Sequence, residues 1–448
     1  MGAGKTTIAR SLGLPHVETD ADVPLELFDE GEAAYRAREA EVVRDVLQRS
    51  EPVVVDLGGG AVTTPEVRAL LKEHATVVWL DVDLEVAWRR VEGTHRPLAR
   101  SYEEFKRLYE ERRAVYAEAA DVVARDADDV VLAAAGIHVD HGALQRLGEL
   151  VAGDGSIALV SDPQVAGIHG MDAQLALGPR LAETHELPPG GEAKTLAAVD
   201  RLWQDLRLDR TGTIAALGGG CTTDAAGFAA AAYLRGIAWT PVPTSLVAQV
   251  DAAIGGKTAI DLPQGKNLVG AFHWPARTVI DPALLETLPE PQRLEGMAEV
   301  VKTGLLAGEP LWELPDGELV RRCAAFKAAI CLRDPYERGE RAILNLGHTF
   351  AHALEAAAGY EGLTHGRAVA LGLLAALRLS GRDTSVVEEL LRPQPARVDR
   401  ERAWQAMHRD KKARDGELRL VLLGGDGPRS GVVLPEPDVR SELDRLIA

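Results

Sequence analysis

The sequence predicts an α/β protein in three parts: a parallel sheet that follows a phosphate-binding loop and lacks its first strand, a Rossmann-like α/β domain, and a mostly helical metal-binding domain. Three observations carry this prediction. The glycine-rich segment 2–7 opens a helix-like run, apolar strands and helical segments alternate up to about Asp281, and the pattern beyond is mostly helical. A length of 448 residues suits about three domains of roughly 150 residues. We expect their bounds at 1–134, 135–284 and 285–448.

Composition and charge exclude several classes of protein. With 50 basic and 68 acidic residues the formal charge is −18, which argues against nucleic acid or an anionic membrane as a partner and leaves small-molecule substrates. The three cysteines form no Cys-x-x-Cys pair and suggest no disulfide framework, so we expect a cytoplasmic protein. Only 10 of the 50 basic residues are lysines. A lysine in this chain therefore tends to mark a place that needs a compact ammonium group.

The N-terminal glycine-rich segment is typical of a loop that binds phosphates at the start of a helix. Its backbone N–H groups can bind phosphate oxygens, Lys5 can reach the transferring group, and the Thr6 hydroxyl can hold Mg2+. The first glycine of the full G-x-x-x-x-G-K-[ST] pattern would fall two residues before Met1, and the strand that should precede the loop is missing. We therefore expect that Met1 is an internal methionine and that the natural protein begins upstream.

The elements that follow the loop come in a specific order. Polar residues follow the first helix and lie on a second one, an apolar strand at Val53–Val55 ends in three glycines, and a strand at Thr76–Leu80 precedes two basic segments. The motifs are Glu18-Thr19-Asp20, Tyr35-Arg36, Gly58-Gly59-Gly60, Arg96-Pro97-Leu98 and Glu111-Arg112-Arg113-Ala114-Val115-Tyr116. In this order they resemble shikimate kinase over nearly the whole first part, which is then a P-loop kinase-like domain.

The resemblance to shikimate kinase implies ATP, Mg2+ and shikimate as ligands. ATP and Mg2+ would bind Gly2, Gly4, Lys5, Thr6, Thr7, Glu18 and Arg96, and shikimate would bind Asp20, Arg36, Gly59, Gly60 and Arg112. Phosphoryl transfer mainly requires positioning and neutralisation of charge, which these groups supply. Glu18 stands where the family usually has Asp. The alternative is a truncated module without catalysis, which zero turnover of shikimate would reveal.

A glycine turn and two lysines stand out in the second part. The apolar run Ile214–Leu217 leads into the glycines 218–220, as in a strand entering a turn that lets backbone amides approach a pyrophosphate. Lys257 and Lys266 are nine residues apart and each lies beside glycine, which favours contacts with anions over a solvated surface. The pattern therefore predicts binding sites for a pyrophosphate and for other anionic groups.

A glutamate and three histidines on predicted helices are candidate metal ligands. Glu299 lies three residues before Lys302 on one side of a helix, His348 and His352 share a face at a spacing of four, and His365 follows. One carboxylate and two or more imidazoles are a usual set for a catalytic zinc ion with an open position. From spacing alone, both His348 and His352 are predicted ligands.

From Asp162 to Lys412 the motifs resemble, in order, those of 3-dehydroquinate synthase. The resemblance implies that zinc or cobalt binds Glu299, His348 and His365, with His352 free as an acid/base. It places NAD on Asp162, Glu192, Lys194, Gly219, Gly220, Asp224, Thr244, Ser245, Lys266 and Thr287. The substrate, a phosphorylated seven-carbon keto acid, would contact Arg235, Asp251, Asn267, Lys411 and Lys412. The catalytic residues would be Lys257, Lys302, Lys327, Glu337, Arg341, Asn345 and His352.

The reaction implied is conversion of 3-deoxy-D-arabino-heptulosonate 7-phosphate to 3-dehydroquinate and phosphate. NAD takes a hydride from C5, phosphate leaves, the hydride returns, and the ring opens and closes as a carbocycle, while zinc polarises the C4 and C5 oxygens. The alternative is a metal- and NAD-dependent polyol dehydrogenase, for which a cluster of lysines has no use. Release of phosphate without net NADH formation would separate the two. We also expect a homodimer through this part of the chain.

Overall fold

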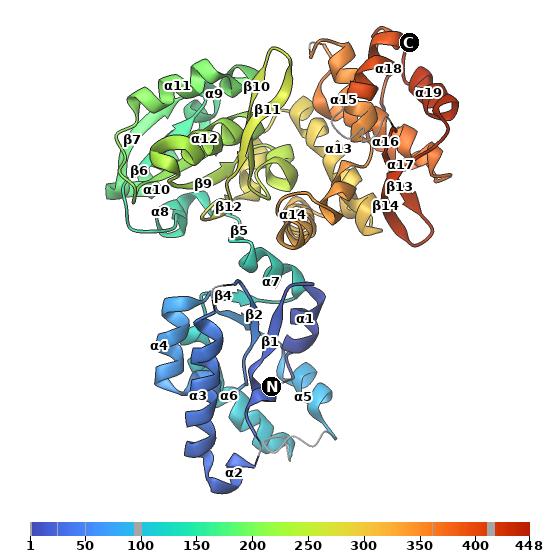
Figure 1. The fold of residues 1–448 in the computed structure, drawn as a ribbon. Coiled ribbons are helices and arrows are strands. Elements are labelled where there is room, and N and C mark those ends of the chain that lie inside the picture. The colour runs from blue at the N-terminus through green and yellow to red at the C-terminus, as the bar shows by residue number, and fades with distance from the viewer. Residues whose placement is uncertain (1, 25, 50, 94–100, 361, 410–416) are drawn as a thin grey trace. The chain divides into compact units, whose positions relative to one another are not determined.

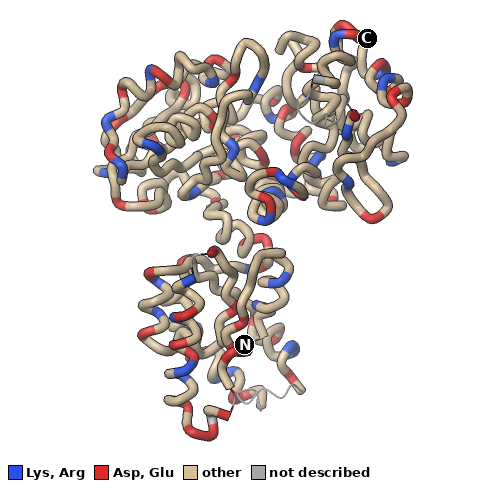
Figure 2. Tube along the Cα trace, in the orientation of Figure 1, with Lys and Arg blue, Asp and Glu red and all other residues tan. Residues whose placement is uncertain are grey.

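The computed structural model describes the chain except for residues 1, 25, 50, 94–100, 361 and 410–416. The chain divides into two compact units, residues 1–135 and 136–448 (Figure 1). Basic and acidic residues are interspersed along both units (Figure 2). Within the described ranges, no helix has both the length and the apolar character needed to cross a membrane.

The first unit contains two separate pairs of parallel strands. Strand β1 (His16–Glu18) pairs with β2 (Val54–Asp56), and β3 (Val78–Leu80) pairs with β4 (Val122–Ala124). Helix α1 (Lys5–Ser11) is the first element, so no described strand precedes the glycine loop, as expected. The other helices are α2 (Leu27–Glu30), α3 (Glu32–Leu47), α4 (Pro65–His74), α5 (Leu84–Val91), α6 (Tyr102–Ala119) and α7 (Ala127–Ala134).

The core of the first unit forms where apolar faces of α3 and α4 meet. Val43 on α3 and Val67 on α4 have no exposed surface, and Leu71 packs in the same cluster. The carboxyl ends of β1 and β2 lie side by side, because Glu18 is the register partner of Asp56. Since β2 leads directly into the turn at residues 58–60, this turn lies next to the end of β1 as well.

The α/β part of the second unit is built on a four-stranded parallel sheet. Its strand order is β7 (Leu181–Glu186), β6 (Ile157–Ser161), β8 (Thr213–Gly218) and β9 (Ala238–Pro243), and β5 (Ile137–Val139) pairs with β12 (Thr278–Ile280). Every residue of β6 and β8 is buried, as expected for strands covered on both faces. The helices are α8 (Leu147–Leu150), α9 (Pro163–Val165), α10 (Met171–Leu177), α11 (Leu196–Asp205) and α12 (Gly220–Ala232).

An antiparallel hairpin interrupts the predicted alternation of strands and helices. Strands β10 (Lys257–Leu262) and β11 (Gly265–Phe272) follow β9 without an intervening α-helix, and most of β11 is exposed. The alternation therefore ends at β9 and not near Asp281, because a hairpin with a short turn needs no crossover helix. The hairpin lies on the side of the α/β part that faces the helices (Figure 1). It carries the two lysines predicted to contact anions.

The rest of the second unit is mostly helical, as predicted. Its helices are α13 (Glu290–Ala307), α14 (Asp316–Arg333), α15 (His348–Ala357), α16 (His365–Leu379), α17 (Ser385–Leu390), α18 (Arg400–Arg409) and α19 (Glu436–Arg445). A hairpin of β13 (Leu420–Gly424) and β14 (Gly427–Val432) packs with them. Buried Val301, Phe350, Leu354 and Leu373 belong to one core cluster that joins α13, α15 and α16.

Candidate active sites

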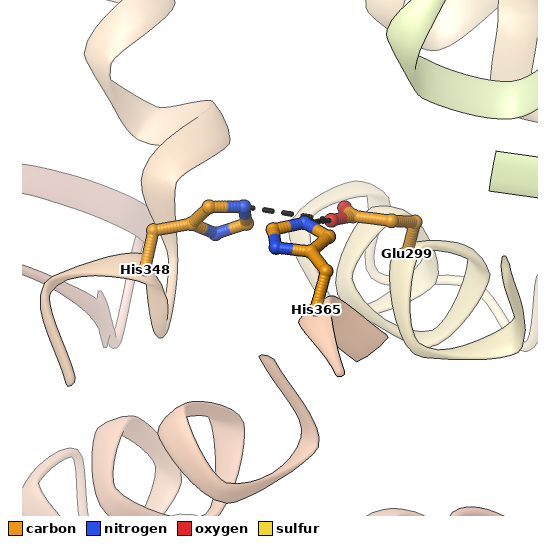
Figure 3. Close-up of side chains that lie close together, drawn as sticks. All are labelled: Glu299, His348 and His365. Carbon is orange, nitrogen blue, oxygen red and sulfur yellow. Dashed lines mark hydrogen bonds and ion pairs between the residues drawn. The ribbon is translucent and has the colours of Figure 1, made fainter. Parts of the chain in front are cut away.

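The described residues include one group that could hold a metal ion, formed by Glu299, His348 and His365. One candidate ligand atom from each residue lies within 4.8 Å of the others (Figure 3). The Oε1 atom of Glu299 is 3.4 Å from Nε2 of His348 and 3.2 Å from Nε2 of His365. This is the set that the resemblance implies. The prediction from spacing alone differs, because His352 is exposed and its ring centroid lies 5.5 Å from that of His348.

Close helix packing brings these three side chains together. A Cβ atom at Gly366 would lie 2.5 Å from Cα of Glu295, so glycine allows the start of α16 to contact α13. A Cβ atom at Gly372 would lie 2.1 Å from the carbonyl oxygen of Gly347, which precedes His348. Both distances are shorter than van der Waals contact allows, so these two glycines let α16 approach α13 and α15 closely enough for the ligands to meet.

The protonation of the cluster suits a cation. Burial lowers the pKa of His348 to about 4, and its Nδ1 lies 3.2 Å from the carbonyl oxygen of Leu346, which leaves the lone pair on Nε2 facing Glu299. Burial opposes ionisation of Glu299, but Lys302 holds the pKa of this carboxyl well below its usual range. Burial also opposes protonation of His365, yet the carboxylates of Glu299 and Glu355 raise its pKa to about 10. A bound cation would replace that proton.

Glu355 is a part of this site that sequence reasoning missed. It lies on α15, 2% exposed, with Oε2 at 3.5 Å from Nδ1 of His365 and Oε1 accepting a hydrogen bond of 2.8 Å from Nζ of Lys266. The pKa of Glu355 falls to about 2 against the effect of burial, because His365 and Lys266 lie beside it. The spacing of seven residues from His348 was the available signal, since it places Glu355 on the same face of α15.

Two buried lysines flank an aspartate next to the cluster. Lys302 is 2% exposed, with Nζ at 2.5 Å from Oε2 of Glu299 and 3.3 Å from Oδ1 of Asp251. Nζ of Lys327 lies 3.0 Å from Oδ2 of Asp251 and donates to its carbonyl oxygen at 2.7 Å. Burial opposes the charge on Lys302, but the two carboxylates raise its pKa above the ordinary value. The Lys302 side chain is therefore cationic at neutral pH.

A second group of polar side chains joins the hairpin to the helical part. Lys257 on β10 forms a close ion pair with Glu337, and Nδ2 of Asn345 donates to the same carboxylate at 2.9 Å. Burial and the nearby charges of Arg341 and Lys327 lower the pKa of Lys257, although Glu337 acts in the opposite direction. Arg341 is 2% exposed and donates to the carbonyl oxygens of Gly255 and Pro335. The backbone of Glu337 has a φ of 54°, which is unusual for a residue other than glycine.

Several residues assigned to NAD lie at the carboxyl end of the parallel sheet. Nζ of Lys194 is 2.5 Å from Oδ2 of Asp224 and also contacts Asn267, so these three residues form one cluster. A Cβ atom at Gly219 would lie 3.4 Å from Oγ of Ser245, which shows that the β8 turn and the segment after β9 are close. The N–H of Thr244 donates to the carbonyl of Gly218. These contacts place the carboxyl ends of β8 and β9 at a common edge of the sheet.

The remaining predicted NAD and substrate residues are more dispersed. Asp162 accepts hydrogen bonds from the N–H groups of Gln164 and Val165, and Thr287 contacts buried His169 at 2.8 Å. Glu192 and Arg235 are exposed, and Gly220 begins α12. Lys411, Lys412 and Arg96 lie outside the described residues.

In the first unit, the glycine loop contacts the end of β2. The Thr6 hydroxyl donates a short hydrogen bond to Asp56, and Nζ of Lys5 lies 3.5 Å from the same carboxylate. Gly2 and Gly4 have φ values of 69° and 87°, and a Cβ atom at Gly2 would lie 2.3 Å from the carbonyl of Ala87. Arg90 on α5 donates to the carbonyls of Gly2 and Ala3. Thr7 is exposed on α1.

The residues assigned to shikimate gather around the glycine turn 58–60. A Cβ atom at Gly60 would lie 2.2 Å from Nη2 of Arg36, and one at Gly58 would lie 2.1 Å from Oδ1 of Asp20. Nη1 of Arg112 donates to the carbonyl of Gly59 at 3.0 Å. Sequence reasoning missed Glu39, which is buried and accepts from Arg36 at 2.7 Å. The turn therefore has two arginines and two carboxylates around it.

Three family models match successive parts of the chain. Residues 1–136 match the model of the shikimate kinase family, residues 184–295 that of the N-terminal part of 3-dehydroquinate synthase, and residues 296–413 that of its C-terminal part. A 3-dehydroquinate synthase of Bordetella pertussis is 39% identical over 342 residues, which cover 69% of this chain and 95% of the relative. One of Gloeobacter violaceus is 42% identical over 346 residues, covering 69% of this chain and 96% of the relative.

Solved structures resemble the second unit. A 2-deoxy-scyllo-inosose synthase, solved with carbaglucose-6-phosphate, NAD+ and Co2+, has a TM-score of 0.62 and 26% identity, and the match covers 69% of this chain and 96% of that one. A glycerol dehydrogenase of Schizosaccharomyces pombe, with 17% identity, a TM-score of 0.51 and coverage of 69% and 88%, shares the fold.

Fold, site and relatives together define a fused enzyme, in which a phosphotransferase domain precedes a phosphate-eliminating lyase. The chain belongs to the 3-dehydroquinate synthase family, and its first unit is a shikimate kinase domain.

Proposed function

We propose that the second unit converts 3-deoxy-D-arabino-heptulosonate 7-phosphate to 3-dehydroquinate and phosphate with NAD and zinc or cobalt. The first unit phosphorylates the 3-hydroxyl of shikimate with ATP and Mg2+. The observation that carries the first proposal is the cluster of Glu299, His348 and His365 directly beside the buried cations Lys302 and Lys327. A metal site next to fixed positive charge suits a substrate that carries neighbouring hydroxyl groups and is also an anion.

The donor set fits a catalytic zinc ion. One carboxylate oxygen and two imidazole nitrogens converge, and three protein ligands leave a position open for substrate oxygen atoms. Bound zinc supplies a Lewis acid, and bound NAD supplies a reversible hydride acceptor. The chain itself orients the ligands: Leu346 fixes the tautomer of His348, and Glu355 lies behind His365.

Replacement of Glu355 by glutamine is expected to weaken zinc binding by about 10-fold to 100-fold, the usual cost of losing an outer partner of a metal-bound histidine. The amide keeps the shape of the side chain but loses the charge that faces His365 and Lys266. Competition with a chromophoric chelator measures the affinity. Glu290→Gln, the same change at an exposed position on α13, serves as the control. Equal zinc affinity in the two variants would contradict a role for Glu355.

The cations of the site are arranged to bind and orient an anion. Lys257 comes from the hairpin, whereas Arg341, Lys302 and Lys327 come from the helical part. The substrate carboxylate and phosphate would then meet fixed charges in an otherwise acidic protein. Glu337, held by Lys257 and Asn345, is placed to accept or return a proton once a substrate anion draws Lys257 away. The exposed imidazole of His352, next to His348, is the other candidate for proton transfer.

A polyol dehydrogenase shares the fold but has no need for this arrangement. Burying two ammonium groups around Asp251 is costly unless they serve an anion or an ion-pair network. Steady-state assay with the seven-carbon phosphate and NAD is expected to release inorganic phosphate with no net accumulation of NADH. Accumulation of NADH with a neutral polyol, and no phosphate release, would favour the dehydrogenase.

The kinase proposal is supported by two clusters that meet at the end of β2. The loop residues Lys5 and Thr6 lie on one side, and the turn with Asp20, Arg36 and Arg112 lies on the other. ATP phosphates on the loop would then face a small polyhydroxy acid at the turn, with Asp20 available to the attacking hydroxyl. Catalysis in this class depends on such positioning and on charge neutralisation.

A paired assay with a zinc-selective chelator tests both halves of the proposal. In excess Mg2+, the chelator is expected to abolish phosphate release from the seven-carbon substrate and to leave shikimate phosphorylation unchanged. Added Zn2+ or Co2+ should restore the first reaction. A synthase that keeps its full rate without zinc would refute the metal site, and zero phosphorylation of shikimate in the untreated chain would refute the kinase.

A further inference from the structure

A buried carboxylate beside the phosphate loop has no part in the function proposed above. Asp56 ends strand β2, is 7% exposed, and precedes the glycine turn that starts at Gly58. Because the first unit is proposed to be a kinase, we infer that Asp56, together with the Thr6 hydroxyl, holds the Mg2+ ion of ATP. Asp56 thus takes the place that sequence analysis assigns to Glu18.

Both side-chain partners of Asp56 come from the loop. Oδ2 accepts the hydrogen bond of the Thr6 hydroxyl, and Oδ1 lies 3.5 Å from Nζ of Lys5. In a phosphate loop the lysine contacts the terminal phosphates and the threonine contacts the metal ion. Asp56 therefore lies where the metal and the phosphate oxygens meet when nucleotide is bound.

The charge of Asp56 requires a cation in that complex. When Lys5 moves to the phosphates, the carboxylate loses its ion-pair partner and faces another anion from a buried position. A divalent cation between them removes this repulsion, and a carboxylate with a hydroxyl oxygen is the kind of ligand that Mg2+ prefers. A buried carboxylate here would otherwise weaken ATP binding.

The backbone around Asp56 is held in place. The hydroxyl of buried Thr19 donates to the carbonyl of Asp56 at 3.3 Å and accepts from the N–H of Gly58 at 3.1 Å. These two bonds tie the end of β1 to the end of β2. The carboxylate is thus positioned before any ligand arrives, which a metal site requires.

Glu18 has a different environment, although it lies beside Asp56. The two residues are register partners on neighbouring parallel strands. The Glu18 side chain is 34% exposed and pairs with Nη2 of Arg10 at 3.5 Å, whereas that of Asp56 is 5% exposed and contacts Thr6 and Lys5. Glu18 therefore lies further out, where it can reach the ion only through water.

The sequence carries a matching signal. The apolar run Val53–Val55 ends in Asp56 just before the glycines, and in many phosphate-loop nucleotidases the loop hydroxyl and a strand-ending aspartate hold the metal together. Pairing of β2 in the sheet thus brings Asp56 to the loop. The residues of the loop alone do not indicate this contact.

Matched variants test the assignment in the full chain. Asp56→Asn and Glu18→Gln each remove one charge with little change of shape, from positions directly opposite one another. Calorimetry measures the affinity of each variant for a non-hydrolysable ATP analogue, in excess Mg2+ and in excess EDTA. The ratio of these two affinities gives the gain in nucleotide affinity that Mg2+ provides. This measurement does not depend on turnover.

Asp56→Asn is expected to lose at least about 10-fold of the gain due to Mg2+. Its affinity for the metal-free analogue should stay equal or rise, because the repelling carboxylate is gone. Glu18→Gln should keep the gain to within about 3-fold, because this side chain is more exposed than that of Asp56 and its charge is better screened by water. An equal or larger loss in Glu18→Gln would overturn the assignment of Asp56.

A second variant covers the case in which Asp56→Asn does not fold. Asp56→Cys should bind the analogue more tightly with Cd2+ than with Mg2+, because a thiolate prefers soft cations, and Glu18→Cys should not show this reversal. The same preference for Mg2+ in both cysteine variants would overturn the proposal. A wild-type chain that binds no nucleotide would overturn the kinase function as well, whereas normal binding with an unaffected Asp56→Asn would overturn this inference alone.

Discussion

Replacement of Glu299 by glutamine is expected to abolish synthase turnover through loss of the metal. Glu299 is the only carboxylate in the cluster, and it faces both imidazoles through one oxygen atom. Glutamine keeps the volume but removes the negative charge that offsets a divalent cation in a buried site. We expect zinc affinity to fall by more than about 100-fold, beyond the usual cost of an outer partner. Metal content after dialysis and phosphate release from the seven-carbon substrate measure the two effects.

The fold should survive this change, since Lys302 keeps Asp251 as a partner at 3.3 Å. Shikimate phosphorylation in the same chain reports on the first unit and should be unchanged. Glu290→Gln, exposed on the same helix, controls for the substitution itself. A Glu299→Gln protein that retains one zinc per chain after dialysis would contradict the ligand assignment.

Replacement of Lys302 by methionine is expected to lower synthase turnover, as Glu299→Gln does, but to leave zinc bound. The change removes a buried ammonium from between two carboxylates, Glu299 at 2.5 Å and Asp251 at 3.3 Å. Loss of one partner of a buried ion pair costs about 3 to 5 kcal/mol of stability. Loss of a charged donor at an active site lowers turnover by about 100-fold to 1000-fold.

Zinc should remain bound in Lys302→Met and should bind more tightly, because a positive charge next to Glu299 has been removed. Urea unfolding, metal content and phosphate release measure these three effects. Lys72→Met, an exposed lysine on α4 in the other unit, is the control. Parallel loss of zinc in Lys302→Met and Glu299→Gln would show that Lys302 only maintains the local fold.

The strands could be predicted where they are buried on both faces. The apolar run predicted as a strand at Ile214–Leu217 lies within β8, because a parallel strand covered by helices needs apolar residues at nearly every position. The strand predicted at Val53–Val55 is β2, shifted by one residue to end at Asp56. The hairpin β10–β11 was not distinguished from the alternating pattern, since its exposed second strand has little apolar periodicity.

The metal cluster shows the limit of spacing along one helix. A separation of four residues puts His348 and His352 on one face of α15, but it does not say which other helix that face meets. The approach of α16 to α13 at Gly366, and to Gly347 at Gly372, decides that His365 meets Glu299. Resemblance of the ordered motifs to 3-dehydroquinate synthase identified the same three residues before any packing was known.

By itself the sequence determined the family of each part, the order of the motifs and the scarcity of lysines, because these depend on local residue type and spacing. Only the tertiary structure decided which charges face one another. Lys302 and Lys327 meet Asp251 across 51 and 76 residues of chain, Glu355 lies behind His365, and Asp56 contacts the phosphate loop. The strength of a buried charge pair depends on distance in space and on burial, neither of which a linear pattern records.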